Sequence, residues 1–205
     1  MKRYAPHINI REKDRKNADL MNAVELLEHG RDKDAFQFLQ LSANNNNPTA
    51  QYLLGLLYAT GNGVEQSFVH AVQNFTNAAE QDLPEAQNDL AQCYFEGTGV
   101  AKNDMLAVYW YGRAAQLGYA ESQLCLGNMY LGGTGVEKSP EKAFGWFLKA
   151  AEQGNLDAQF NTAVSYENGN GVAQDLDKAQ YWYSLAAKQG DRDAKKKLKE
   201  LLRRA

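Results

Sequence analysis

The segment AQYLLGLLYATGNGVEQSFVHAVQNFTNAA, residues 50–79, is the first full copy of a pattern that returns every 36 residues. Later copies begin at Ala86, Ser122 and Ala158. A repeat of constant length over most of a chain indicates an array of similar supersecondary units, each of which buries its hydrophobic face against its neighbours. The architecture therefore follows from one copy.

The first half of each copy has the pattern of an amphipathic helix. Ala50, Leu54 and Tyr58 have equivalents in the later copies, and their spacing places them on one helix face. The glycine pair Gly61 and Gly63 follows, and it also recurs. Because glycine reaches left-handed backbone conformations, the pair predicts a helix end and a tight loop.

The second half of each copy predicts another helix. It begins after a residue that can accept hydrogen bonds from the amides of the first helical turn. Those N-cap residues are Ser67, Asn103, Ser139 and Asp175. The helix then carries a small residue, aromatic residues and a closing alanine pair, as in Ala143, Trp146, Phe147 and Ala150–Ala151. The chain is thus predicted to be all-α and built from antiparallel helix pairs.

The consensus A-x3-L-G-x2-Y, G-x-G-V, A-x2-W and A-A resembles the Sel1-like repeat family, within the tetratricopeptide-like superfamily. The resemblance covers residues 50–187. It implies a right-handed α-solenoid (an alpha-alpha superhelix) whose first helices line a concave groove. Three residues depart from the consensus: Asn74 replaces a tryptophan, Asp82 a glycine and Thr162 a leucine.

The predicted domain organisation is an N-terminal tail, residues 1–16, and a single cooperative repeat domain, residues 17–205. Residues 17–43 read as a degenerate repeat with helices 17–28 and 34–43, the second capped by Asp32. The full repeats are expected at 50–79, 86–115, 122–151 and 158–187. A capping helix is expected at 191–204, with Ala194, Leu198 and Leu202 on its buried stripe.

Charge and composition restrict the functional classes. The net charge is −3, but residues 17–187 hold twenty acidic and eight basic residues. An acidic body repels phosphates, so we expect no nucleic-acid partner along the groove. The sequence has no apolar run long enough to cross a membrane, and residues 1–16 lack the apolar core of a secretory signal.

Cysteine usage favours the cytoplasm. Cys93 and Cys125 are 32 residues apart, whereas secreted relatives of the resembling family pair cysteines within each repeat. We expect both cysteines to be small core or groove residues. We also expect a monomer, because salt screens attraction between the acidic body and the basic ends.

Groove positions are expected opposite the packing stripe of each first helix, where the copies differ from one another. They combine apolar, amide and acidic side chains suited to a peptide or helix of another protein. The predicted partner-binding residues are Tyr52, Leu56, Asn88, Gln92, Glu96, Leu124, Asn128, Phe160, Val164 and Asn168. Glu167 is a further acid that could meet a basic side chain. The alternative is that Leu56, Leu124 and Val164 pack only on neighbouring repeats.

The sequence contains no paired metal-ligand motif and no phosphate-binding loop, so we expect no cofactor, no metal and no catalytic residue. The resemblance implies a non-enzymatic adaptor or scaffold in bacterial regulation or signalling. One alternative is penicillin binding or β-lactam hydrolysis, because Ser139-Pro140-Glu141-Lys142 fits Ser-x-x-Lys. Its companion motifs are missing. Another alternative is a dedicated regulator or immunity partner of one cognate protein.

Overall fold

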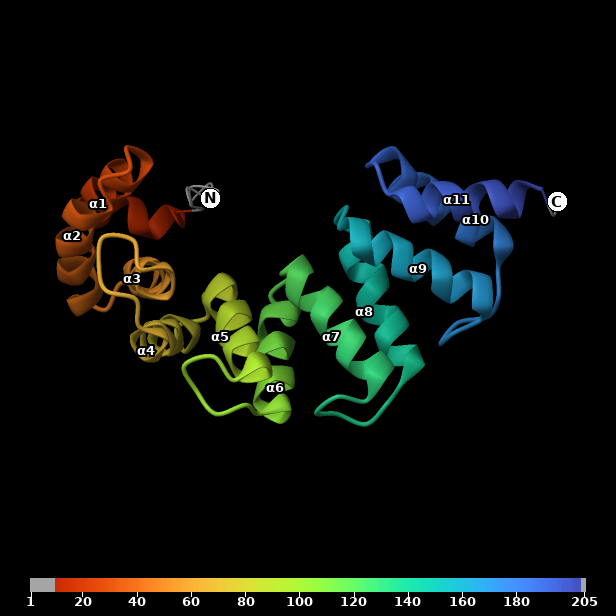
Figure 1. The fold of residues 1–205 in the computed structure, drawn as a ribbon, viewed down its shortest axis with the longest axis horizontal. Helices are drawn as coiled ribbons and strands as arrows, with labels where there is room; N and C mark the ends of the chain where they lie inside the picture. The colour runs from red at the N-terminus through yellow and green to blue at the C-terminus, as the bar shows by residue number, and fades with distance from the viewer. Residues whose placement is uncertain (1–9, 204–205) are drawn as a thin grey trace. The chain divides into compact units, whose positions relative to one another are not determined.

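The computed structural model describes residues 10–203, which form eleven α-helices and one short 3-10 helix, η1 (Figure 1). Each full repeat supplies two helices of about equal length. The elements are η1 (Glu12–Lys16), α1 (Ala18–Glu28), α2 (Asp32–Asn44), α3 (Pro48–Thr60), α4 (Phe68–Ala79), α5 (Pro84–Glu96), α6 (Asp104–Gln116), α7 (Ala120–Gly132), α8 (Pro140–Glu152), α9 (Leu156–Asn168), α10 (Leu176–Lys188) and α11 (Arg192–Leu202).

The chain forms two compact units, Met1–Asn103 and Asp104–Ala205. In the first, η1 packs on α1, and the helices α1, α2, α3, α4 and α5 pack one on the next in chain order. In the second, α6 to α11 do the same. Packing of consecutive helices is typical of an α-solenoid. The predicted all-α fold of 36-residue helix pairs is confirmed, whereas one cooperative domain over residues 17–205 stays a prediction.

Small residues at fixed repeat positions allow close packing between the two helices of a pair. A Cβ atom added at Gly55 would lie 2.5 Å from the ring of Phe75, and one at Gly127 would lie 2.5 Å from the ring of Phe147. Both distances are well below van der Waals contact. At these two positions the ring of the second helix therefore fills the space that a side chain on the first helix would need.

The second glycine of each loop lies against the start of an earlier helix. Gly135 has φ +67°, and a Cβ there would lie 2.3 Å from the carbonyl oxygen of Asp104. Gly99 approaches the carbonyl oxygen of Phe68 in the same way. The loop glycine thus serves two purposes: it reaches the left-handed conformation, and it leaves room for the backbone of the preceding repeat.

The turn between repeats also needs a residue in the left-handed conformation. Two residues other than glycine adopt this conformation there. Asp82 has φ +57° and Asn46 has φ +59°, at positions equivalent to Gly118. Asparagine and aspartate tolerate this conformation better than other residues with a side chain. The run of asparagines before Pro48 is therefore turn chemistry, and Asn47 caps α3 through the amide of Ala50.

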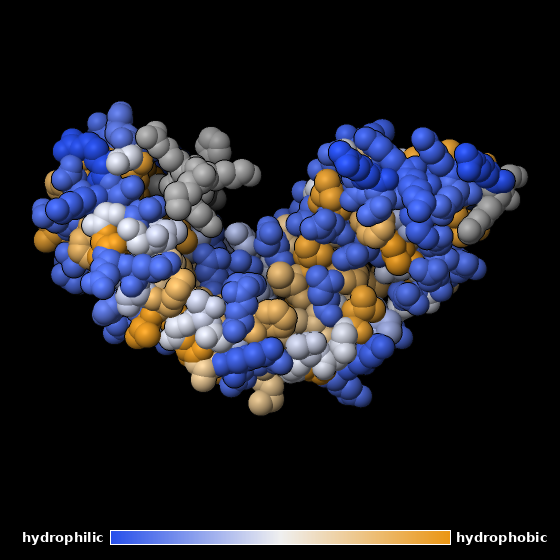
Figure 2. Space-filling model, viewed as in Figure 1, coloured by the Kyte–Doolittle hydropathy of each residue, from blue (hydrophilic) through white to orange (hydrophobic). Residues whose placement is uncertain are grey.

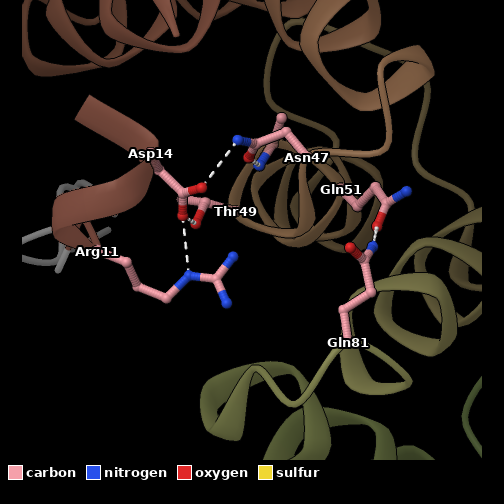
Figure 3. Close-up of polar contacts among 7 residues, drawn as sticks. Arg11, Asp14, Asn47, Thr49, Gln51 and Gln81 are labelled. Atoms are coloured by element: carbon pink, nitrogen blue, oxygen red, sulfur yellow. Dashed lines mark hydrogen bonds and ion pairs between the residues drawn. The ribbon is translucent and has the colours of Figure 1, made fainter. Parts of the chain in front are cut away.

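The N-terminal segment differs from the expected tail. Asp14 in η1 is 5% exposed and accepts hydrogen bonds from Nδ2 of Asn47 at 3.0 Å and Oγ1 of Thr49 at 2.7 Å (Figure 3). Nε of Arg11 also donates to Asp14. The expected tail is therefore wrong for residues 10–16, which dock on the start of α3, while residues 1–9 lie outside the described residues.

Two helix predictions near the chain ends need correction. Asp32 does not cap α2: the helix begins at Asp32 itself, and the preceding Arg31 makes no side-chain cap. In α11, Leu201 is buried and Leu202 is 55% exposed, so the expected buried stripe ends on Leu201. Adjacent residues lie about 100° apart around a helix, so helical spacing alone leaves the two leucines nearly equivalent, and the packing of α11 decides which one is buried.

A regular set of buried glutamines was missed from the sequence. Gln51, Gln87, Gln123 and Gln159 occupy the same repeat position, and all are buried. Nε2 of Gln123 donates to the carbonyl oxygen of Ala115, eight residues earlier, and Gln87 and Gln159 make equivalent bonds. Each of these hydrogen bonds joins the start of a first helix to the end of the helix before it.

A second glutamine completes the arrangement in three places. Nε2 of Gln153 donates to Oε1 of Gln123 at 2.8 Å, and Gln189 does the same to Gln159. Figure 3 shows the third pair, Gln81 to Gln51, at 2.7 Å. Because the accepting glutamines Gln51, Gln123 and Gln159 are buried, the pairs satisfy oxygens that would otherwise destabilise the fold.

Candidate partner-binding surface

In the first unit, the predicted groove residues form hydrogen bonds with their neighbours. The hydroxyl of Tyr52 donates to Oδ2 of Asp89 at 3.0 Å, and Nδ2 of Asn88 donates to Oδ1 of the same carboxylate at 3.1 Å. Nε2 of Gln92 donates to Glu96 one turn on. The carboxylate of Asp89 therefore orients two of the predicted side chains, Tyr52 and Asn88.

Leu56 has a different environment from the polar groove residues. It is half-buried and packs against the hydrophobic core of the first unit. Leu56 therefore packs mainly on its neighbours, which was the alternative to partner binding for this residue.

In the second unit, three predicted residues come together around a pocket of about 360 Å³. Leu124 and Asn128 come from α7, and Phe160 comes from α9. Leu124 is buried and belongs to the core, while Asn128 is exposed. The ring of Phe160 stands edge-on to that of Tyr183, with centroids 5.5 Å apart. The core packing therefore holds the apolar side of the pocket in place.

The other two predicted residues of this unit do not line the pocket. Val164 is half-buried and packs on the core, and the Nδ2 atom of the exposed Asn168 donates to the carbonyl oxygen of Val164. Glu167 is buried and does not offer its carboxylate to a partner as expected. Instead it accepts a hydrogen bond from Tyr183 and pairs with Lys197.

Four pocket residues were missed from the sequence: Asp157, Asn161, Asp191 and Asp193. A signal did exist, because Asp157 and Asp193 are 36 residues apart and the equivalent residues Glu85 and Glu121 are also acidic. An acid in the first turn of a helix also stabilises the helix dipole, so this column has a local explanation. Only the three-dimensional arrangement shows that two members of the column lie at one pocket.

The pocket is acidic. Its lining includes three carboxylates and no basic side chain. Within residues 10–203, Asp157, Asp191 and Asp193 form no ion pair; Asp191 accepts a hydrogen bond from the amide of Ala194 as the cap of α11. Nζ of Lys197 on α11 lies 3.2 Å from Oε2 of Glu167, which does not line the pocket. The pocket therefore combines an apolar side, two amides and uncompensated negative charge.

A model of the Sel1 repeat matches four consecutive segments, 48–83, 84–119, 120–155 and 156–191. The chain belongs to the Sel1 repeat family. Each matched segment begins at the first residue of a first helix, α3, α5, α7 or α9. They therefore include the whole pocket except Asp193.

Solved structures agree with this assignment. A protective antigen of uropathogenic Escherichia coli with an SLR fold is 31% identical, with a TM-score of 0.90 over 94% of this chain and 42% of that one. A Sel1 repeat protein from Oxalobacter formigenes is 35% identical, with a TM-score of 0.83 over 87% and 74%. This chain thus spans less than half the length of the E. coli antigen.

A more distant match is an immunity protein from Pseudomonas aeruginosa. It is 24% identical, with a TM-score of 0.52 over 88% of this chain and 68% of that one, which shows a shared fold alone. No curated protein matches the chain.

The Ser-x-x-Lys motif of this Sel1 protein has a structural explanation. Oγ of Ser139 accepts from the amide of Lys142 as the cap of α8, and it donates to Oε2 of Glu141 at 3.0 Å. The ammonium group of Lys142 lies over the ring of Tyr130, 5.3 Å from its centroid. Lys142 Nζ is therefore not hydrogen-bonded to Ser139, as a base for this hydroxyl would be.

The two cysteines are both free and half-buried. Burial, together with the charges of Asp89 and Glu96, raises the pKa of the Cys93 thiol to about 11. Burial also raises the pKa of Cys125. Since the thiolate is the reactive form, neither cysteine is activated as a nucleophile.

Across residues 10–203, no group of three or more His, Cys, Asp or Glu side chains could hold a metal ion. No helix in that range is long and apolar enough to cross a membrane. Figure 2 shows mainly hydrophilic side chains on the visible face, with hydrophobic residues in small scattered groups.

A second, larger pocket of about 650 Å³ lies on α1 and α2. Its lining includes Leu26 and Phe38, with the exposed ion pair between Arg31 and Asp34 at its edge. None of the predicted partner-binding residues lines it.

Proposed function

We propose that this Sel1 repeat protein is a non-enzymatic adaptor that binds a peptide or helix of another protein on the exposed side of its first helices. The observation that carries the proposal is the α7–α9 pocket, where Leu124, Asn128 and Phe160 lie together. These positions vary between repeats, while the packing positions are nearly constant. Such variation is expected where packing repeats and recognition is local.

The chemistry of the pocket suits a polypeptide. Leu124 and Phe160 offer apolar contact, and the side-chain amides of Asn128 and Asn161 can both donate and accept hydrogen bonds. An extended peptide exposes alternating donors and acceptors along its backbone, so amides are suitable partners for it. In the first unit, the Tyr52–Asp89–Asn88 network supports the same role, since it holds two polar side chains in defined positions.

The biological setting is part of the proposal. We place the protein in the cytoplasm as a monomer that acts in bacterial regulation or signalling. Free Cys93 and Cys125 fit a reducing compartment. Binding to one cognate protein, as a dedicated regulator or immunity partner, is a special case of the same activity.

The test is a pull-down from native lysate with two matched variants. Asn128→Lys places a bulky cation at the exposed mouth of the pocket, while Asn170→Lys makes the same change in an exposed loop. We expect a protein retained by the wild type and by Asn170→Lys to be missing from Asn128→Lys. An identical set of retained proteins would show that the α7–α9 surface is not the site, and an empty set would contradict the adaptor proposal.

A further inference from the structure

We propose that the α7–α9 pocket receives the side chain of an arginine on the bound segment. This inference rests on the proposed function and adds the chemistry that the partner must have. Asp157, Asp191 and Asp193 contribute three carboxylates, and no lysine or arginine of the described chain pairs with them.

One basic residue of α11, the helix that carries Asp193, is already engaged away from the pocket carboxylates. Nζ of Lys197 on α11 lies 3.3 Å and 3.2 Å from the two carboxylate oxygens of Glu167, which is buried. Breaking that pair would leave a buried charge without its partner, which is strongly unfavourable. Within residues 10–203 the three pocket carboxylates form no ion pair, and complementary charge favours a cationic ligand.

The size and composition of the pocket favour an organic cation over a metal ion. Among residues 10–203 no cluster of acidic side chains is close enough to cage a metal, so the three aspartates surround the space without converging on one point. The pocket volume of about 360 Å³ accommodates a long side chain. Its apolar side, formed by Leu124 and Phe160, can cover the methylene groups of that chain.

Arginine matches these features better than lysine. Its planar guanidinium group stacks on aromatic rings and presents several donors in a fixed plane, so it can meet more than one carboxylate at once. The side-chain oxygens of Asn128 and Asn161 offer further acceptors. A lysine could pair with the carboxylates, but its compact ammonium group cannot stack on the ring of Phe160 as a planar guanidinium group can.

The experiment uses the full chain and fluorescently labelled peptide pools. Each pool has one fixed central residue and randomised flanks; one pool carries arginine and its control carries citrulline, the neutral isostere. Binding is measured by anisotropy for the wild type, Asp157→Asn/Asp193→Asn and Asp177→Asn. The last is a matched control because Asp177 is a first-turn acid of α10, so it tests for loss of helix-dipole stabilisation alone.

We expect the wild type and Asp177→Asn to bind the arginine pool about tenfold more tightly than the citrulline pool. The double variant should lose that ratio while still binding peptides. Equal binding of both pools by the wild type would overturn the arginine assignment and leave the adaptor proposal standing. A ratio retained by the double variant would place the arginine site elsewhere, and no binding of any pool would contradict both proposals.

Discussion

The hydroxyl of Tyr183 donates a 2.6 Å hydrogen bond to Oε2 of Glu167, which joins α10 to α9 in the last full repeat. Tyr183 is fully buried and Glu167 is 8% exposed. The same carboxylate pairs with Lys197 of α11. One buried acid thus connects three consecutive helices.

Tyr183→Phe should destabilise the protein by about 1–3 kcal/mol, because it removes a donor from a buried carboxylate. The ring should still fit, since the equivalent position holds phenylalanine at Phe75 and Phe147. Urea unfolding followed by circular dichroism measures the change. Tyr181→Phe on the same helix is the control: Tyr181 is 57% exposed, so its effect should stay within about 0.5 kcal/mol. Equal effects of the two changes would contradict this account.

The same contact predicts a loss of stability at alkaline pH. Burial first, and then the hydrogen bond and charge of Glu167, raise the pKa of Tyr183 well above its ordinary value of 10. The unfolded chain therefore releases this proton near pH 10 while the folded chain retains it, so the free energy of unfolding falls as pH rises above about 10. Tyr183→Phe should show a shallower decline than the wild type. Parallel pH profiles would exclude Tyr183 as a cause.

Asp14→Ala should release residues 10–16 from α3 and lower the free energy of unfolding by about 1–3 kcal/mol, because Asn47 and Thr49 lose a buried acceptor. Faster amide hydrogen exchange in residues 10–16 is the direct measurement. Glu12→Ala, an exposed change in the same 3-10 helix, is the control and should leave exchange nearly unchanged.

A pH dependence accompanies the Asp14 contact. Burial alone would raise the pKa of Asp14, but hydrogen bonds from Thr49 and Arg11, the Arg11 charge and a hydrogen bond from Asn47 together hold it below its ordinary value of 3.8. The contribution of this contact is therefore complete above that value and is lost as pH falls through the lower folded pKa. The protection of residues 10–16 against exchange, relative to the intrinsic exchange rate at each pH, should fall in that acidic range.

Gln153→Leu should cost about 1–3 kcal/mol, because Oε1 of the buried Gln123 would lose the donor that it has at 2.8 Å. Gln116→Leu, which changes an exposed glutamine, is the matched control. Thermal unfolding distinguishes the two. If Gln153→Leu were as stable as the control, the glutamine pairs would contribute nothing measurable.

Two glycine substitutions should have opposite signs. Gly135→Ala should destabilise by more than about 1 kcal/mol, because φ is +67° and the new Cβ would meet the carbonyl oxygen of Asp104. Gly145→Ala should stabilise by about 0.5–1 kcal/mol, since Gly145 lies inside α8 with open space around it. Denaturant midpoints for both variants test the prediction, which is contradicted if the two shifts have the same sign.

Much of the fold could be predicted because the same capping residues and glycines occur at the same positions in several repeats. Ser67, Ser139 and Asp175 cap second helices as their residue types suggested. Gly61, Gly97, Gly133 and Gly169 end the first helices in the left-handed conformation. The N-terminal docking of Asp14 could not be predicted, because it depends on partners more than thirty residues away and occurs once.

The sequence by itself determined the repeat length, the glycine ends of the first helices and the packing faces within the full repeats, because these depend on backbone propensities and on hydrophobic spacing within one helix. Only the tertiary structure decided that Asp157, Asp191 and Asp193 share a pocket with Phe160, that Gln153 reaches Gln123, and that Leu201 is buried in place of Leu202. The physical reason is that these contacts join side chains of different helices. Helical periodicity indicates the direction in which a side chain points, but the neighbour it meets depends on how the helices pack.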